Sequence, residues 1–204
     1  MDRYHHGDLR SALVRAGLEL ARQEGVNALG MRELTRMVGV SPNAAYRHFP
    51  SRRALVLTVA ETAQHELSRS LLEAMTVAGE AAPPADRASE RLRAFCLAYI
   101  GFAIAEPGWF ALTCESREAP PAPHPEAQPA PPPPHQLLLD ALDAMVAAGT
   151  MSRYKRVDAE WSCWSTTHGF AVLATSGPLQ SRPTESTLEL ARTVVDTLIA
   201  GLRT

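Results

Sequence analysis

The sequence lacks the features that would mark a membrane protein or an enzyme. It contains no run of eighteen apolar residues, and its N-terminal stretch MDRYHHGDLR is polar, so we expect neither a membrane span nor a secretory signal. We therefore expect a cytoplasmic protein with no membrane partner. It also lacks a Gly-rich phosphate loop, a GxSxG elbow and an acid pair suited to catalysis. These absences argue against an enzyme.

Cysteine and histidine are too scattered to suggest a metal site. The three cysteines are Cys96, Cys114 and Cys163. They lie far apart in apolar surroundings without a CxxC pair, and we expect all three to be core residues rather than a redox sensor. The histidines His5, His6, His124 and His135 show neither HExxH nor Cys/His ligand spacing. We expect no metal and no cofactor.

Charge is distributed unevenly, although the whole chain carries a net charge of only -2. Residues 1–55 contain nine arginines and five acidic residues, a balance of +4. The rest of the chain contains eleven basic and seventeen acidic residues, a balance of -6. A basic end on an acidic body suggests that one end meets a polyanion while the other has a different task.

Apolar residues recur at helical spacing along most of the chain, and the alternation typical of strands is absent. Asp8 is a candidate N-cap for a first helix that Gly25 ends. A second helix covers Met31 to Val38. Further helices are expected near residues 51–77, 86–105, 136–148, 157–176 and 185–202. The sequence therefore predicts an all-α fold.

Proline-rich stretches divide the C-terminal part of this pattern. Residues 79–85 form a turn or short linker, and Pro107 with Gly108 breaks the helix before them. The run from Ala119 to Pro134 cannot propagate a helix or a central strand, so we expect an exposed, mobile loop, although it could also bind a Pro-binding domain. We expect a DNA-binding domain at residues 1–55 and a helical regulatory domain at residues 56–204.

The segment MRELTRMVGVSPNAAYRHF, residues 31–49, has the organisation of a helix-turn-helix. Such a motif needs two short helices joined by a turn that usually contains Gly, with the second helix free to enter the major groove. Gly39 supplies the turn, and Ser41 with Pro42 begins the second helix. Ala45 and Phe49 are placed to hold this short helix against the first helix.

The outward side of the second helix carries residue types that read DNA. Asn bonds adenine, Arg bonds guanine and a small Ala approaches a thymine methyl, so we assign base reading to Asn43, Ala44 and Arg47. Tyr, His and Arg side chains reach phosphates. The complete set of predicted DNA-binding residues is Arg32, Ser41, Asn43, Ala44, Tyr46, Arg47, His48 and Arg52. An ordinary solvated arginine face is the alternative interpretation.

The same region resembles the "GVS...LY.HF.SK..L" signature of the TetR family of one-component regulators. The matching residues are Gly39, Val40, Ser41, Tyr46, His48, Phe49, Ser51, Arg52 and Leu55. The resemblance covers residues 1–55, with Arg52 where the family usually has Lys and Ala45 where a larger residue is common. It implies about nine helices: three for DNA binding, a connecting fourth, and a regulatory body. It further implies a homodimer, in which each body holds a small-molecule pocket whose ligand changes the separation of the two DNA-binding heads.

The C-terminal half contains a predicted dimer interface. Apolar residues repeat every three or four positions near the end of the chain, a seam suited to packing another helix. The predicted interface residues are Val172, Leu188, Ala191, Val195, Leu198 and Leu202. The stretch WSTTHGFAVL, residues 164–173, is similar to the Trp/His-Gly pattern in one C-terminal subgroup of TetR-like regulators.

Aromatic residues with a few polar atoms predict a pocket for a small hydrophobic or aromatic effector. The candidate lining residues are Phe95, Tyr99, Phe102, Trp109, Phe110, Trp161, Trp164 and His168. Aromatic side chains at helical spacing also form ordinary cores, and His168 could be purely structural. We expect a homodimeric repressor of a pseudo-palindromic, double-stranded operator. The alternative is an all-α small-molecule-binding protein without operator activity.

Overall fold

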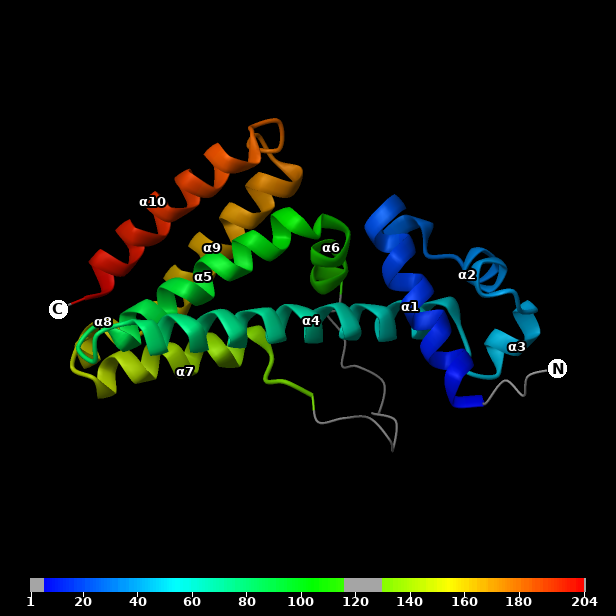
Figure 1. Ribbon diagram of the computed structural model, residues 1–204, viewed down its shortest axis with the longest axis horizontal. Coiled ribbons are helices and arrows are strands. Elements are labelled where there is room, and N and C mark those ends of the chain that lie inside the picture. Colours follow the sequence, from blue (N-terminus) through cyan, green and yellow to red (C-terminus); the bar gives the residue numbers. More distant parts are fainter. Residues whose placement is uncertain (1–5, 116–129, 204) are drawn as a thin grey trace. The chain divides into compact units, whose positions relative to one another are not determined.

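The computed structural model describes residues 6–115 and 130–203 (Figure 1), apart from the side chains of residues 6–8 and 115. Over these residues the chain forms ten α-helices and one short 3-10 helix, and no strand. The all-α prediction is therefore confirmed. The predicted mobile loop falls outside the described residues from Ala119 to Pro129. No single described helix is long and apolar enough to span a membrane, although the bent pair of helical segments Arg87–Ala105 and Pro107–Cys114 together passes that test by length and composition.

The helices group into two compact units, and the boundary falls inside a helix. Unit 1 takes in the described residues up to Glu66 together with those between Glu106 and Ala130, and unit 2 takes in the described residues of Leu67–Ala105 and from Pro131 onward. Unit 1 comprises α1 (His6–Glu24), η1 (Val26–Ala28), α2 (Met31–Val38), α3 (Pro42–Tyr46), the first half of α4 (Arg52–Ala81) and α6 (Pro107–Glu115). Unit 2 comprises the second half of α4, α5 (Arg87–Ala105), α7 (Pro134–Ala147), α8 (Arg153–Arg156), α9 (Ala159–Ser176) and α10 (Thr184–Leu202). The predicted domain boundary at residue 55 stays a prediction.

The core of unit 1 is built from side chains that are far apart in the sequence. Leu13 of α1, Leu34 of α2, Leu55 of α4 and Leu112 of α6 have no exposed surface, and Phe49 retains only 1%. Burying each of these side chains stabilises the unit by about 1.5 to 3 kcal/mol. Helices α1, α2, α4 and α6 thus share one apolar centre with Phe49.

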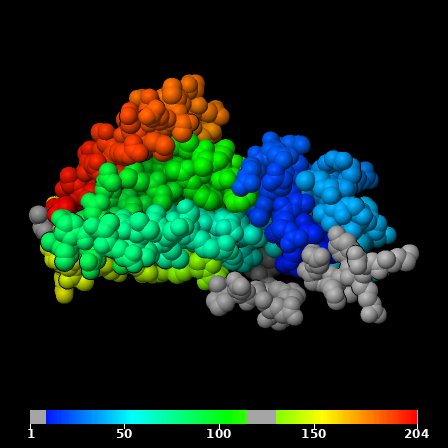
Figure 2. Space-filling model, in the orientation of Figure 1, coloured from blue at the N-terminus to red at the C-terminus, as the bar shows by residue number. Residues whose placement is uncertain are grey.

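Unit 2 is organised around α5, which packs against α7, α9 and α10. Figure 2 shows α10, in orange to red, lying over α5 in green. The side of α5 that carries Leu92, Cys96 and Ile100 is completely buried, so this helix forms the centre of the unit. Apolar side chains from several helices therefore enclose it.

Some local expectations need correction. The first helix begins at His6 and not after Asp8, which lies inside the helix and is therefore not its N-cap. Pro134 begins α7 instead of ending a loop, because proline is favoured at the first helical position. Cys114 is exposed near the end of α6 and is not a core residue.

The other two cysteines are buried as expected. Burial raises the pKa of the Cys96 thiol to about 11 and the pKa of the Cys163 thiol to about 12. A thiol with so high a pKa carries almost no reactive thiolate at neutral pH. These two cysteines therefore act as apolar core residues.

Candidate nucleic-acid interface

The turn between α2 and α3 is fixed by backbone geometry at Gly39. This residue adopts φ 75° and ψ 32°, the left-handed conformation that side chains disfavour. The next amide, of Val40, donates to the carbonyl oxygen of Thr35 at 3.0 Å and so closes the end of α2. Leu34 and Thr35 are buried and hold α2 within unit 1. The chain is thereby redirected into α3.

The five-residue helix α3 is too short to be stable alone, and it is held at its start and from behind. The Ser41 hydroxyl accepts a hydrogen bond from the Ala44 amide at 3.3 Å, and Pro42 occupies the first turn. Ala45 is fully buried, and Phe49 just beyond the helix is buried as well. The guanidinium of Arg10 lies over the Phe49 ring, 5.0 Å from its centre.

The opposite side of α3 is presented to solvent. Asn43, Tyr46 and Arg47 are exposed, whereas Ala44 and His48 are partly buried. Tyr46 leaves 49% of its surface exposed despite its size. Buried residues that hold α3 and exposed residues that face solvent therefore alternate between residues 43 and 49.

Two further predicted arginines lie in the first turns of α2 and α4, the helices that precede and follow α3 in the chain. Arg32 is exposed in the first turn of α2. Arg52, in the first turn of α4, donates from its Nε to the carbonyl oxygen of Leu29 at 2.6 Å, while the residue as a whole remains exposed. A lysine has no equivalent of this side-facing N–H, so the arginine ties α4 to the segment before α2 while it keeps its charge.

One arginine of α2 is partly neutralised. Arg36 pairs with Glu33, and its hydrogen bond lowers the pKa of that carboxyl. The two side chains are on the surface, where such pairs contribute little stability. Arg36 was not among the predicted DNA-binding residues.

The helix α6 is the element of unit 1 that the sequence analysis missed. It packs against α1: the Trp109 Nε1 donates to the carbonyl oxygen of Leu18 at 2.8 Å, and Arg22 lies 4.3 Å from the centre of the Trp109 ring. Arg22 also forms two hydrogen bonds with Glu106, of 2.7 and 2.8 Å. The contact is close because Gly108 has no side chain; a Cβ there would lie 2.8 Å from the Ala21 carbonyl carbon.

Only some of the predicted pocket residues come together, and those do so in unit 2. The Tyr99 hydroxyl of α5 lies 3.0 Å from Nδ1 of His168 on α9. The His168 ring stacks on Trp164 with centroids 5.9 Å apart, and Tyr99 meets Trp164 edge-on at 5.7 Å. His135 of α7 completes the group, 5.7 Å from Trp164. We call Tyr99, His135, Trp164 and His168 the aromatic cluster.

The other predicted pocket residues occupy different positions. Phe95 is buried beside Tyr99, with ring centroids 6.3 Å apart, and Phe102 is partly buried on α5. Trp161 is 59% exposed and touches only the edge of the aromatic cluster, through His135. Trp109 and Phe110 lie on α6 and belong to unit 1, where Phe110 is buried. Burial lowers the pKa of His168, which favours its neutral form.

The predicted dimer residues divide between two sides of their helices. Ala191, Val195 and Leu202 are buried where α10 packs within unit 2, so their side chains are not available to a partner. Leu188 and Leu198 are partly buried, and Val172 on α9 is 39% exposed. The predicted dimer interface stays a prediction. Within the part of the chain that is described, no group of three His, Cys, Asp or Glu residues could hold a metal ion.

In unit 1, buried apolar side chains hold α3, whose first turn is capped by Ser41 and whose outer side is polar and exposed. This arrangement defines a helix-turn-helix DNA-binding protein. Comparison with known families agrees with this class. Residues 13–59 match the model "Bacterial regulatory proteins, tetR family", and residues 92–198 match "Tetracyclin repressor-like, C-terminal domain". The chain belongs to the TetR family of DNA-binding transcriptional regulators, whose members are not enzymes.

Solved structures with the same fold extend over the whole chain. A protein of unknown function from Rhodococcus sp. RHA1 is 29% identical, with 100% of both chains covered and a TM-score of 0.77. A TetR-family regulator from Pectobacterium atrosepticum is 17% identical, with 100% of this chain and 98% of that one covered and a TM-score of 0.68. A TetR variant from Acinetobacter baumannii AYE, solved with minocycline, is 19% identical over 98% and 96%, with a TM-score of 0.57. No curated protein matches the sequence.

Proposed function

We propose that the chain is a ligand-responsive repressor that binds a pseudo-palindromic operator as a homodimer. The observation that carries this proposal is the arrangement of α3, which is buried through Ala45 and anchored by Phe49 while Asn43 and Arg47 face solvent. A helix held in this way can enter the major groove without losing its anchor. Two such helices in a symmetric dimer would lie about 34 to 36 Å apart, or a multiple of it, along the DNA.

The roles of the DNA-binding residues follow from side-chain chemistry and exposure. Asn43 and Arg47 read bases by paired hydrogen bonds, and Ala44 beside them is small enough to approach a thymine methyl. Arg32, Tyr46 and the other predicted contacts bind phosphates and position the helix. The complete set of proposed phosphate contacts is Arg32, Tyr46, His48 and Arg52, together with Ser41, which lies at the start of α3 next to the turn.

The homodimer forms through the outward sides of α9 and α10. These two helices pack together in unit 2, and the side of α9 that faces away from the core exposes Val172 and Leu173 by 39% and 44%. The corresponding side of α10 carries Thr193, Thr197 and Ala200, all exposed and uncharged. Small, uncharged side chains allow two helix pairs to approach closely around a twofold axis.

The dimer is tested by placing a charge in the proposed interface. Val172→Arg should convert a dimer to a monomer in light scattering coupled to size-exclusion chromatography, because an unpaired charge would be buried. The matched control is Val157→Arg, at a residue that is 70% exposed outside that surface. Dimers of unchanged stability for Val172→Arg would exclude this surface.

The effector binds at the aromatic cluster. Rings with a hydroxyl and imidazole nitrogens suit a planar ligand that also forms hydrogen bonds. The similarity to a regulator solved with minocycline supports a small-molecule site in this family. The chain passes from α5, which carries Tyr99, directly into α6, which packs on α1. A ligand that shifts α5 thus has a covalent route to unit 1.

Selection of genomic fragments by the purified protein tests the function as a whole. The expected result is strong enrichment of a pseudo-palindromic site, with binding that weakens steeply as salt increases. Planar aromatic compounds that quench tryptophan fluorescence should then release this fragment, and Trp164→Leu should reduce the release. Quenching without enrichment of any fragment would favour the alternative, a small-molecule-binding protein without operator activity.

A further inference from the structure

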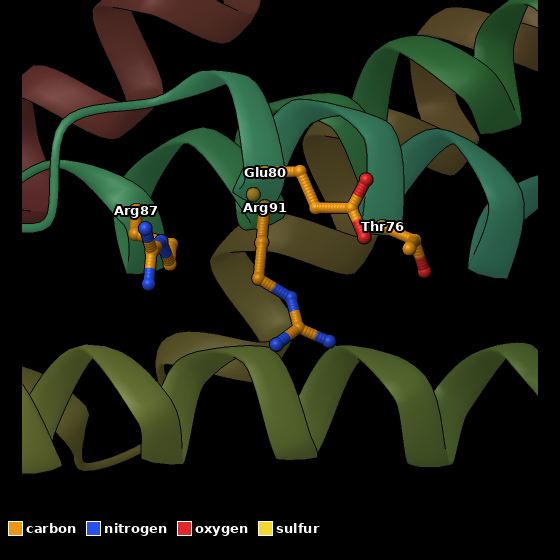
Figure 3. Close-up of a pocket in the computed structure, with 5 residues that line it drawn as sticks. Thr76, Glu80, Arg87 and Arg91 are labelled. Atoms are coloured by element: carbon orange, nitrogen blue, oxygen red, sulfur yellow. The ribbon is translucent and has the colours of Figure 1, made fainter.

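The end of α4 and the start of α5 flank a cavity that is open to solvent and has a mostly charged and polar lining. It has a volume of 370 Å³ and is lined by Thr76, Gly79, Glu80, Arg87 and Arg91. This volume lies within the range of about 300 to 1,000 Å³ that is typical of small-molecule sites. Figure 3 shows Arg91 and Glu80 reaching into the space, with Arg87 and Thr76 on either side of them. None of these residues belongs to the aromatic cluster or to the predicted DNA-binding set.

Two arginines of this cavity have no acidic partner in the described part of the chain. Arg87 and Arg91 are one turn apart on α5, so they project from the same side of the helix. Arg93 on the same helix differs, because it pairs with Asp196 at 2.5 Å. The guanidinium groups of Arg87 and Arg91 therefore keep their hydrogen-bond donors for an external anion.

The residues of α4 set the position of the Arg91 side chain and add a negative charge to the cavity. A Cβ at Gly79 would be only 2.9 Å from Cγ of Arg91, so the bare glycine lets the arginine stem lie directly against α4. Glu80 supplies a carboxylate to the same space. The Thr76 hydroxyl donates to the Leu72 carbonyl oxygen at 2.7 Å, which leaves its lone pairs as acceptors.

We propose that this cavity binds a small organic acid that also carries an ammonium group. The two guanidinium groups hold the carboxylate through charge-assisted hydrogen bonds, which are stronger than neutral ones. Glu80 attracts the ammonium group and repels a second carboxylate. The binding site is thus selective for a zwitterion over a dianion of the same length.

Calorimetric titration of the full-length protein with 4-aminobutyrate and with succinate tests the proposal, because both probes contain a four-carbon chain. We expect 4-aminobutyrate to bind more tightly than succinate. Glu80→Gln should weaken binding of 4-aminobutyrate and strengthen binding of succinate, and Arg91→Gln should weaken both about tenfold or more. Arg153→Gln, at an exposed arginine of α8 outside the cavity, is the matched control and should change neither affinity.

Three results would overturn the proposal: no saturable binding of 4-aminobutyrate, succinate binding as tightly as 4-aminobutyrate, or Arg91→Gln binding both probes like the unmodified protein. Circular dichroism should show that each variant is folded. Glu80→Gln alters only an exposed side chain, so this variant should fold. Its shift in preference from 4-aminobutyrate toward succinate therefore tests the proposal even where Arg91→Gln is unstable. The aromatic cluster and α3 are unchanged in every variant, so this test is separate from operator binding.

Discussion

The two units use aromatic side chains in opposite ways. In unit 1, Phe49 is buried among apolar side chains, and the single polar atom of the Trp109 ring is bonded to the backbone of α1. In unit 2, Tyr99, Trp164 and His168 contact one another through rings and polar atoms, and the imidazole is only partly buried. Unit 1 therefore resembles a rigid frame, whereas unit 2 keeps hydrogen-bonding groups inside a ring cluster.

The helices that carry the two candidate sites, α3 in unit 1 and α5 in unit 2, also differ in length. The helix α3 has five residues and depends on its cap and its anchors, whereas α5 has nineteen and is surrounded by other helices. A short helix that must reach into DNA needs precise local support. A long central helix can instead adjust around a bound molecule.

Removing the Phe49 ring should damage unit 1 most. Phe49→Ala deletes a ring that is 1% exposed, and loss of its packing should cost about 3 to 5 kcal/mol. Hydrogen exchange of the α1 to α3 amides measures this local stability. Tyr46→Ala, a nearby exposed aromatic, is the control and should change stability by less than about 0.5 kcal/mol. Similar losses for both variants would contradict the rigid-frame description.

Adding a methyl group should have opposite effects in the two units. Gly108→Ala forces a Cβ against the Ala21 backbone and should destabilise unit 1 by about 1 to 3 kcal/mol. Gly101 lies within α5 with no neighbouring atom near its missing Cβ, so Gly101→Ala should stabilise unit 2 by about 0.5 to 1 kcal/mol. Thermal unfolding of each variant provides the comparison. A harmless Gly108→Ala would mean that α6 does not pack closely on α1.

Loss of the α3 cap should have a smaller and more local effect. Ser41→Ala removes the acceptor of the Ala44 amide and should destabilise the start of α3 by about 1 kcal/mol. Exchange of the Ala44 and Ala45 amides should accelerate, while the centre of α5 remains unaffected. Ser165→Ala, at an exposed serine of α9, serves as the control. Unchanged exchange in α3 would show that its buried side chains hold it without the cap.

The smallest expected effect is a pH dependence confined to unit 2. Burial lowers the pKa of His168 below its usual 6.5. The unfolded chain therefore takes up a proton at a higher pH than the folded one, so stability is complete above about 6.5 and falls as the pH decreases toward the folded pKa. His168→Gln should flatten this part of the stability profile measured by denaturant titration. An identical slope for the two proteins would exclude the histidine as its source.

The sequence predicted the local features well because their signals are local. The Gly39 turn and the Ser41 cap with Pro42 are encoded in adjacent residues, and the structure contains both. The role of α6 was missed because Pro107 and Gly108 indicate only a break in the chain. Gly108 allows close contact with Ala21, a residue that lies far away in the sequence. The neighbouring contact between Arg22 and Glu106 likewise joins residues 84 positions apart.

In the candidate sites, too, features set by nearby residues were predicted and contacts between distant residues were not. Exposure of Asn43 and Arg47 follows from their helical register against the buried Ala45, which a periodic pattern reveals. Register did not separate the two sides of α10, because small and apolar residues occur on both, and so the predicted dimer interface included Ala191 and Val195, which are buried within unit 2. His135 joins the aromatic cluster from a separate helix, a contact that spacing along the chain does not encode.

We propose that Asn43 on α3 reads DNA sequence, whereas Tyr46 on the same helix binds phosphate. The most direct measurement is the affinity of the unmodified protein, Asn43→Ala and Tyr46→Ala for the selected operator and for random DNA over a series of salt concentrations. Asn43→Ala should lose preference for the operator and keep its salt slope, whereas Tyr46→Ala should weaken binding to both DNAs. Equal losses on operator and random DNA for Asn43→Ala would contradict the claim.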